Sequence, residues 1–129
     1  MKLLLDTHIL LWWLSDDPVL PAAAKAAIGD PASEVFVSAA TVWEIAIKHA
    51  LGRLDFPIAG MPAIIGQAGF TPLGIAVEHA ILAGGLPPHH HDPFDRMLVA
   101  QARHEGLTIV SADAMIRRYP VAVLDGSND

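Results

Sequence analysis

Short apolar runs of strand length recur along the chain. Residues 2–6 are a leucine-rich run that ends in an acid, residues 34–38 contain Val-Phe-Val, and residues 107–111 and 121–124 are similar. Residues 70–73 are a weaker candidate. The runs are continuously apolar rather than alternating, which is typical of parallel strands that are covered on both faces. The pattern therefore predicts a parallel sheet.

Segments with helical periodicity lie between these runs. We expect helices at residues 7–14, 21–28, 39–51, 75–83, 93–105 and 112–119. The clearest is 93–105, because Asp92 is suited to the N-cap, Pro93 to the first helical position and Gly106 to the end. Ser38 is suited to cap the helix that follows it, and Pro120 stops the last one.

Strands that alternate with helices predict a three-layer α/β fold with right-handed crossovers. In such folds ligands bind beyond the carboxyl ends of the strands. The Pro- and Gly-rich stretches 56–60 and 84–88 are expected to be loops inside one domain. We expect this domain to span residues 1–125, followed by a short tail at 126–129.

Composition narrows the class of protein. The chain has 129 residues, 53% hydrophobic and 17% charged, which suits one globular domain and excludes intrinsic disorder. The absence of cysteine excludes disulfides, thiolate metal sites and cysteine catalysis. We find no signal peptide and no run of the roughly 18 apolar residues that a membrane helix needs, so we expect a cytoplasmic protein. The net charge of −6 argues against binding nucleic acid by bulk charge alone.

Acidic residues gather at the edge of the predicted sheet where ligands bind. Asp6 directly follows the first strand, and Asp113 lies two residues beyond the strand at 107–111. Glu44 lies in the helix that leaves the second strand. Asp92 and Asp95 begin a helix that runs antiparallel to the strand it feeds, so its start faces the same edge. We therefore expect acids from four separate segments to share one cleft.

Crowded carboxylates favour a divalent cation, and with it a class of chemistry. Like charges at close range are costly unless protons or a cation intervene, and carboxylate and water ligands suit Mg²⁺ or Mn²⁺. Such an ion activates a bound water and stabilises a leaving oxygen, which suits phosphodiester hydrolysis. Structural alternatives exist: Asp6 could end a strand, Glu44 could pair with Lys48 on the surface, and the remaining acids could cap or stabilise helix starts.

Four segments carry the most specific motifs of the chain. They are LLLDTH at 3–8, SAATVWEI at 38–45, HHDPFDRMLVAQA at 90–102 and LTIVSAD at 107–113. Together they resemble the PIN domain, and more narrowly the VapC-type toxins of bacterial toxin–antitoxin pairs. The resemblance implies a three-layer α/β/α fold with five parallel strands in the order 3-2-1-4-5. It also implies an endoribonuclease that depends on Mg²⁺ or Mn²⁺ and a cognate antitoxin that covers the cleft.

The resemblance also implies roles for individual residues. It implies a catalytic and metal-binding quartet formed by Asp6, Glu44, Asp95 and Asp113. Asp92 would be an auxiliary acid at the rim, Thr7 a hydroxyl behind the acids, and Ser111 a hydroxyl beside a metal-bound water. One departure is His91, because relatives often carry a basic residue there. Neutral histidine attracts phosphate less, which affects RNA affinity rather than cleavage chemistry.

Other side chains near the expected cleft have weaker signals. We expect a basic rim that holds RNA phosphates, with ordinary surface charge as the alternative, formed by Lys48, Arg53, Arg96, Arg117 and Arg118. The run His89–His91 is expected to be a solvated loop, because consecutive side chains diverge and no spaced pair supports zinc. Trp12 and Trp13 lie about 100° apart on one helix, so one of them is a candidate contact for a partner.

The sequence leaves three functional hypotheses open. The first is a metal-dependent endoribonuclease that acts as a toxin on transfer or ribosomal RNA. The second is another metal-dependent nuclease or a phosphatase, although the Asp-x-Asp of aspartyl-phosphate enzymes is absent, since Thr7 and His8 follow Asp6. The third is a non-catalytic module whose acids bind a basic partner. The high apolar fraction also leads us to expect a homodimer.

Overall fold

The computed structural model describes residues 1–126, in which the strands form one parallel sheet. The strands are β1 (Lys2–Leu5), β2 (Glu34–Ser38), β3 (Thr71–Leu73), β4 (Thr108–Ser111) and β5 (Val123–Asp125). Their order is β3-β2-β1-β4-β5, which confirms the predicted 3-2-1-4-5 arrangement. Leu4 of β1 is in register with Phe36 of β2 on one side and with Ile109 of β4 on the other.

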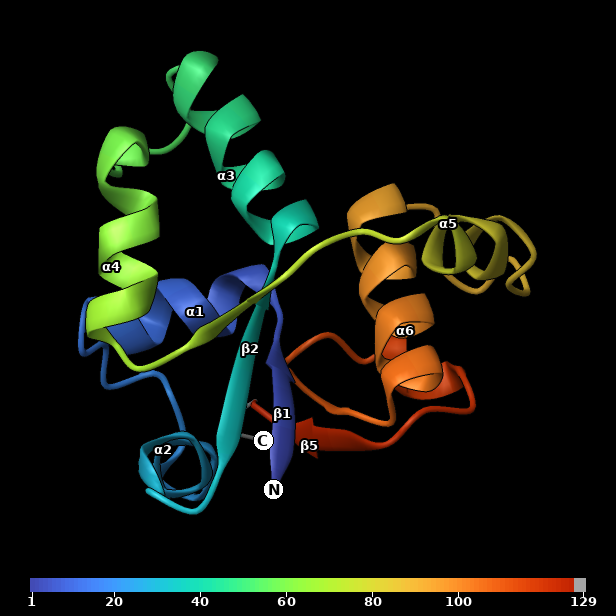
Figure 1. Cartoon of the computed structure of the whole chain (residues 1–129), viewed down its shortest axis with the longest axis horizontal. Coiled ribbons are helices and arrows are strands. Elements are labelled where there is room, and N and C mark those ends of the chain that lie inside the picture. The colour runs from blue at the N-terminus through green and yellow to red at the C-terminus, as the bar shows by residue number, and fades with distance from the viewer. Residues whose placement is uncertain (127–129) are drawn as a thin grey trace.

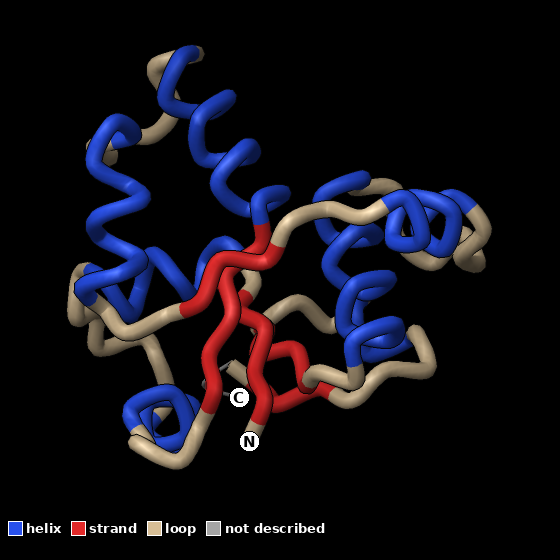
Figure 2. The backbone as a smooth tube through the Cα atoms, in the orientation of Figure 1, coloured by secondary structure: helices blue, strands red, loops and turns tan. Residues whose placement is uncertain are grey.

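Helices cover both faces of this sheet and complete the three-layer α/β/α fold. They are α1 (Thr7–Leu14), α2 (Ala22–Gly29), α3 (Ala39–Ala50), α4 (Met61–Gln67), α5 (Val77–Gly84) and α6 (Pro93–Glu105), with short 3₁₀ turns η1 (Ile58–Gly60) and η2 (Ile116–Arg118). In Figures 1 and 2, α1, α2 and α4 lie on one side of the strands, and α5 and α6 lie on the other. The helix α3 extends beyond the carboxyl end of β2 (Figure 1).

Two hydrophobic clusters, one on each face, hold the layers together. Leu3 and Leu5 of β1 belong to the cluster with α1, α2 and α4, which includes Leu10. Leu4 belongs to the other cluster, where it joins Leu98 of α6. All three leucines of β1 are fully buried. The unbroken leucine run is therefore explained by a central strand covered on both faces.

One local prediction was wrong, and one helix was not predicted. Residues 112–119 form only the 3₁₀ turn η2 instead of an α-helix. The segment is too short to nucleate a helix easily, and the Asp113 carboxylate accepts from the N–H of Met115 at 2.8 Å, which favours a turn. The helix α4 was missed, because Pro62 in its first turn, together with Gly60 and Gly69 on either side, makes the stretch resemble a loop.

The carboxyl-terminal end of the chain is described only in part. Of the predicted tail at 126–129, residues 127–129 lie outside the described residues. The N–H of Gly126 donates to the carbonyl of Ser111 at 2.8 Å, so this residue still continues the pairing with β4. No helix within residues 1–126 is long and apolar enough to cross a membrane.

Gly106 offers a test of the predicted end of α6. It has φ 69°, in the left-handed region, and an added Cβ would meet no atom within 4 Å. Gly106→Ala should therefore lower the free energy of unfolding by about 1 kcal/mol through backbone conformation alone. Gly66→Ala, exposed and helical in α4, is the matched control and should raise it by up to about 1 kcal/mol. Urea unfolding measures both, and an unchanged Gly106→Ala would contradict the left-handed end.

Candidate active site

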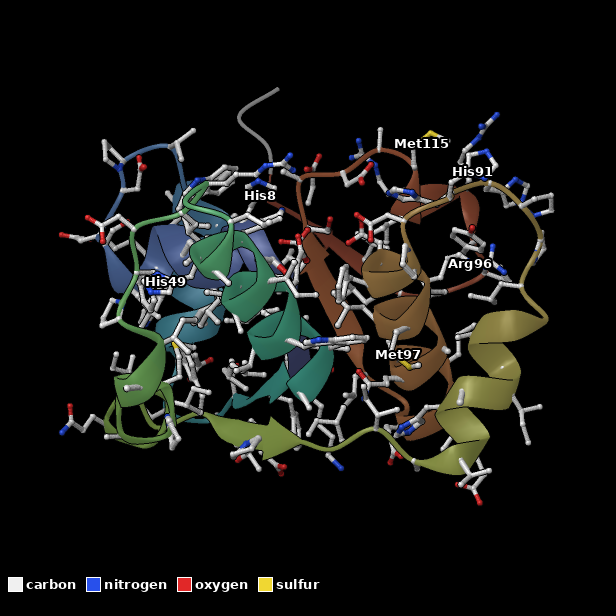
Figure 3. The ribbon with its side chains drawn as sticks, turned by 90° about the horizontal axis from the view of Figure 1, so that it is seen from above. His8, His49, His91, Arg96, Met97 and Met115 are labelled. Carbon is white, nitrogen blue, oxygen red and sulfur yellow. The ribbon has the colours of Figure 1, made fainter. Side chains whose placement is uncertain are left out.

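The structure brings the four predicted acids together in one cleft of about 450 Å³. Asp6 follows β1, Glu44 lies on α3, and Asp113 follows β4. Asp95 lies in the first turn of α6. Figure 3 looks onto this edge of the sheet, where carboxylate oxygens gather between α3 and α6. The cleft is built where the carboxyl ends of parallel strands meet the starts of helices, as the topology requires.

Asp6 is held rigidly by two hydrogen bonds. It is the N-cap of α1, because its Oδ1 accepts from the N–H of Ile9 at 3.0 Å. Its Oδ2 accepts from the hydroxyl of Ser111 at 2.5 Å. The same Ser111 oxygen accepts from the N–H of Asp113 at 3.0 Å. The proton of Ser111 is thus donated to Asp6, and this hydroxyl links the ends of β1 and β4.

Glu44 is buried and has a partner on each oxygen. The hydroxyl of Thr7 donates to Oε1 at 2.7 Å, which places Thr7 behind the acids. Lys48 donates to Oε2 at 2.6 Å, so the pairing with Lys48 exists. It is not an ordinary surface contact, however, because only 6% of Glu44 is exposed. The ammonium of Lys48 therefore stands at the wall of the cleft.

Asp92 combines a structural role with a place at the rim. Its Oδ1 accepts from the backbone N–H of Phe94 at 2.8 Å and of Asp95 at 3.4 Å, as an N-cap does. It also lines the cleft. Asp92 can therefore be both the N-cap of α6 and an acid at the rim of the cleft, since the cap uses only its Oδ1.

His90 is a residue of this site that the sequence did not single out. Its Nε2 lies 2.8 Å from Oδ2 of Asp113 and 3.0 Å from Oδ2 of Asp95. His91 is exposed and points outward (Figure 3). A position beside the cleft was predicted for the histidine run, but three consecutive identical residues carry no signal that selects the middle one.

The expected basic rim is only partly formed. Among the basic residues predicted for it, Lys48 alone lines the cleft within the described part of the chain. Arg96 is not free for phosphate, because its guanidinium donates to the carbonyls of Ala83, Leu86, Pro87 and His90. Arg117 pairs with Asp125 at 2.7 Å, and Arg53 is exposed beyond the end of α3.

Aromatic side chains are also distributed differently from the expectation. Trp12 lines the cleft beside His8, with ring centroids 6.0 Å apart. Trp13 packs against Phe70 on the core side. Trp43 is the most exposed tryptophan in the described chain, at 61%, and its ring meets Phe94 edge-on. The partner contact expected for Trp12 or Trp13 stays a prediction, and Trp43 is a further exposed aromatic side chain on α3.

A second cavity of about 420 Å³ lies between α3, α4 and β3. Its walls are almost entirely apolar and include Val42, Trp43, Met61, Ile65 and Leu73. We call it the apolar groove. It differs in chemistry from the acidic cleft, although both are lined by residues of α3.

The electrostatics of the cleft reflect the crowding of its acids. Burial raises the pKa of Asp6 above its ordinary value, although its hydrogen bonds with Ser111 and Ile9 oppose the shift. Burial, together with the charge of Asp92, raises the pKa of Asp95 to about 7, against the lowering effect of His90. Two carboxyls of the cleft therefore resist ionisation, and a bound cation would relieve that cost.

The carboxylates of the cleft fit a hard divalent cation. Carboxylate oxygens of Asp95 and Asp113 lie within 4.8 Å of each other and of a ring nitrogen of His90. Asp6 and Glu44 line the same cleft and offer further carboxylate oxygens. Oxygen-rich sets of this kind suit Mg²⁺ or Mn²⁺.

Comparisons with known proteins agree with this architecture. The family model of the PIN domain matches residues 3–122. Ribonuclease VapC22 of Mycobacterium tuberculosis is 29% identical over 122 residues, which cover 90% of each chain. Two solved structures match with a TM-score of 0.69 and cover 97% of this chain and 98% of theirs. They are VapBC of Salmonella typhimurium bound to DNA, at 20% identity, and VapBC2 of Rickettsia felis bound to a promoter fragment, at 13%. At these identities the solved structures show the fold.

The raised pKa of Asp95 predicts a stability that depends on pH. The folded chain holds the proton of Asp95 more tightly than the unfolded chain does. The protonated carboxyl therefore adds fully to the free energy of unfolding below about pH 4, and this contribution is lost as the pH rises to about 7. Without divalent ions, the stability advantage of Asp95→Asn over the wild type should grow by at least about 1 kcal/mol between about pH 4 and pH 8. Added Mn²⁺ should reduce this advantage. Urea unfolding across pH tests both, and parallel curves would contradict the raised pKa.

Proposed function

The chain belongs to the PIN domain family, and from this premise we propose that it is a metal-dependent endoribonuclease that acts as the toxin of a toxin–antitoxin pair. The observation that carries the proposal is the convergence of Asp6, Glu44, Asp95 and Asp113 in one cleft. The similarity to Ribonuclease VapC22 supports ribonuclease activity in particular.

The quartet would hold Mg²⁺ or Mn²⁺, with Asp92 at the rim. When bound, the ion supplies Lewis acidity and a water of lowered pKa for in-line attack on phosphorus. Neighbouring hydroxyl groups hold the acidic side chains in fixed orientations. Ser111 fixes the orientation of Asp6, and Thr7 fixes that of Glu44. Rigid placement matters, because small errors in the position of a catalytic group cost large factors in rate.

RNA would meet a cleft with the ammonium of Lys48 and the rings of Trp12 and His8 at its walls. Lys48 can pair with a phosphate that approaches the acids, since 41% of its side chain is exposed. Trp12 and His8 line the same cleft and offer ring faces to an unpaired base. These features favour single-stranded RNA, whose unpaired bases are free to stack on aromatic rings.

A cognate antitoxin is the partner that we propose, by analogy with the VapBC complexes of similar fold. The acidic cleft attracts a basic side chain, and the apolar groove offers surface to an apolar segment of the same partner. The homodimer stays a prediction. Exposed apolar side chains available for it include Trp43 and Leu51 near α3, and Val77 and Ile81 on α5.

Cleavage of single-stranded RNA tests the proposed function. In Mn²⁺ or Mg²⁺, Asp6→Asn and Asp95→Asn should each slow cleavage by at least about a hundredfold, because the ion contributes several kcal/mol to the transition state. The matched control is Asp55→Asn, an exposed acid outside the cleft, which should cleave as the wild type does. Gel assays of purified protein, with EDTA and with single-stranded DNA in parallel, measure these rates.

The controls separate the alternative hypotheses. Equal cleavage of DNA would favour another type of metal-dependent nuclease, and hydrolysis of phosphomonoesters alone would favour a phosphatase. If neither metal nor the two substitutions affect any hydrolysis, the acids would be a binding surface for a basic partner, and the proposed ribonuclease would be wrong.

A further inference from the structure

The imidazole of His90 is inserted between two acids of the cleft. Its Nε2 is within hydrogen-bond distance of Oδ2 of both Asp95 and Asp113, at 3.0 and 2.8 Å. The second oxygen of Asp113, Oδ1, accepts from the N–H of Met115 at 2.8 Å. The side chain of His90 therefore reaches the space between one oxygen of Asp95 and one oxygen of Asp113, two acids that would hold a cation.

The other ring nitrogen determines which chemistry Nε2 can perform. Nδ1 lies 3.2 Å from the backbone N–H of Asp92, which donates to it. A neutral imidazole that accepts at Nδ1 carries its proton on Nε2. Nε2 is then a hydrogen-bond donor to the two carboxylates and has no free lone pair for a metal ion.

The loop that carries His90 is held firmly in place. The backbone N–H of His90 donates to the hydroxyl of Tyr119 at 2.8 Å, and its carbonyl accepts from Arg96 at 3.3 Å. Tyr119 is only 3% exposed and donates in turn to the carbonyl of Pro87 at 3.0 Å. Arg96 adds bonds to the carbonyls of Ala83 and Leu86. The position of the imidazole is thus built into the fold.

We propose that His90 is a built-in competitor of the divalent ion, whose N–H group occupies the place between Asp95 and Asp113 that the ion would take. This inference rests on the proposed function, because it concerns the metal of that site. In the metal-free protein, His90 offsets the repulsion between the two acids. Binding of the ion then requires His90 to release at least one carboxylate, which weakens the apparent affinity for the ion.

Two conservative variants separate a competitor from a ligand. His90→Asn keeps an acceptor near the position of Nδ1 for the N–H of Asp92, but it is too short to reach the carboxylates. His90→Gln places an amide N–H near the position of Nε2 and so keeps the donor. His91→Asn, at the exposed neighbouring position, is the matched control.

The experiment is a calorimetric titration of each metal-free protein with Mn²⁺ in the absence of RNA. His90→Asn should bind Mn²⁺ about tenfold more tightly than the wild type, since the ion no longer displaces charge-assisted hydrogen bonds. His90→Gln and His91→Asn should bind as the wild type does. Weaker binding by His90→Asn would make His90 a ligand and overturn the proposal, and unchanged binding would overturn it as well.

A measurement on the wild type does not depend on how the variants fold. Nitrogen chemical shifts of the His90 ring, followed during titration with diamagnetic Mg²⁺, should report a proton on Nε2 before and after saturation. A proton that moves to Nδ1 when the ion binds would identify Nε2 as a ligand and overturn the proposal. Failure of the metal site on which the proposed function rests has a different signature, because then no protein, wild type included, binds either ion at the cleft.

Discussion

The burial of several carboxylates close together at one edge of the sheet is the constraint around which the site is organised. Burial is the largest cost of ionising Asp6 and Asp95 and the first cause of their raised pKa values, and the charges of neighbouring carboxylates add to that cost. The fold offsets it with donors placed one by one: Ser111 on Asp6, Thr7 on Glu44, and His90 between Asp95 and Asp113. These bonds lower the cost without removing it, and a divalent cation bound in the cleft would lower it further.

The scaffold can hold the acids because its centre is strongly buried. Burying a leucine side chain contributes about 1.5–3 kcal/mol, and β1 buries three in succession immediately before Asp6. The strand ends therefore cannot move apart to relieve the charge. The start of α6 is fixed by the cap of Asp92 and by the loop that Arg96 and Tyr119 hold. The buried core that stabilises the fold therefore also keeps the acids close together.

Much of this could be predicted from the sequence, for a physical reason. In a parallel sheet the end of every strand lies on the same edge, so the place of Asp6 and Asp113 follows from strand pattern alone. The start of α6 followed from Asp92 and Pro93, because caps depend on local sequence. The role of His90 could not be predicted, since it depends on loop contacts with Tyr119 and on the tautomer set by a backbone N–H. The expected place of Arg96 in the basic rim fails for the same reason. Its guanidinium donates to backbone carbonyls of the preceding segment, and the spacing of residues in the sequence does not reveal such bonds.

The position of α3 explains how one partner could control both surfaces of the molecule. Glu44 and Lys48, four residues apart, share the face of α3 that lines the acidic cleft. Val42, Trp43 and Ala46 line the apolar groove from another face of the same helix. A helix with its side chains is about 10 Å across, so a chain segment seated in the groove needs only a few residues to pass over α3. A basic side chain at the end of such a segment would compete for the same carboxylates as His90 and the ion. Control of the cleft by a partner therefore requires no change of fold, because the charges that would bind a metal would also bind its competitor.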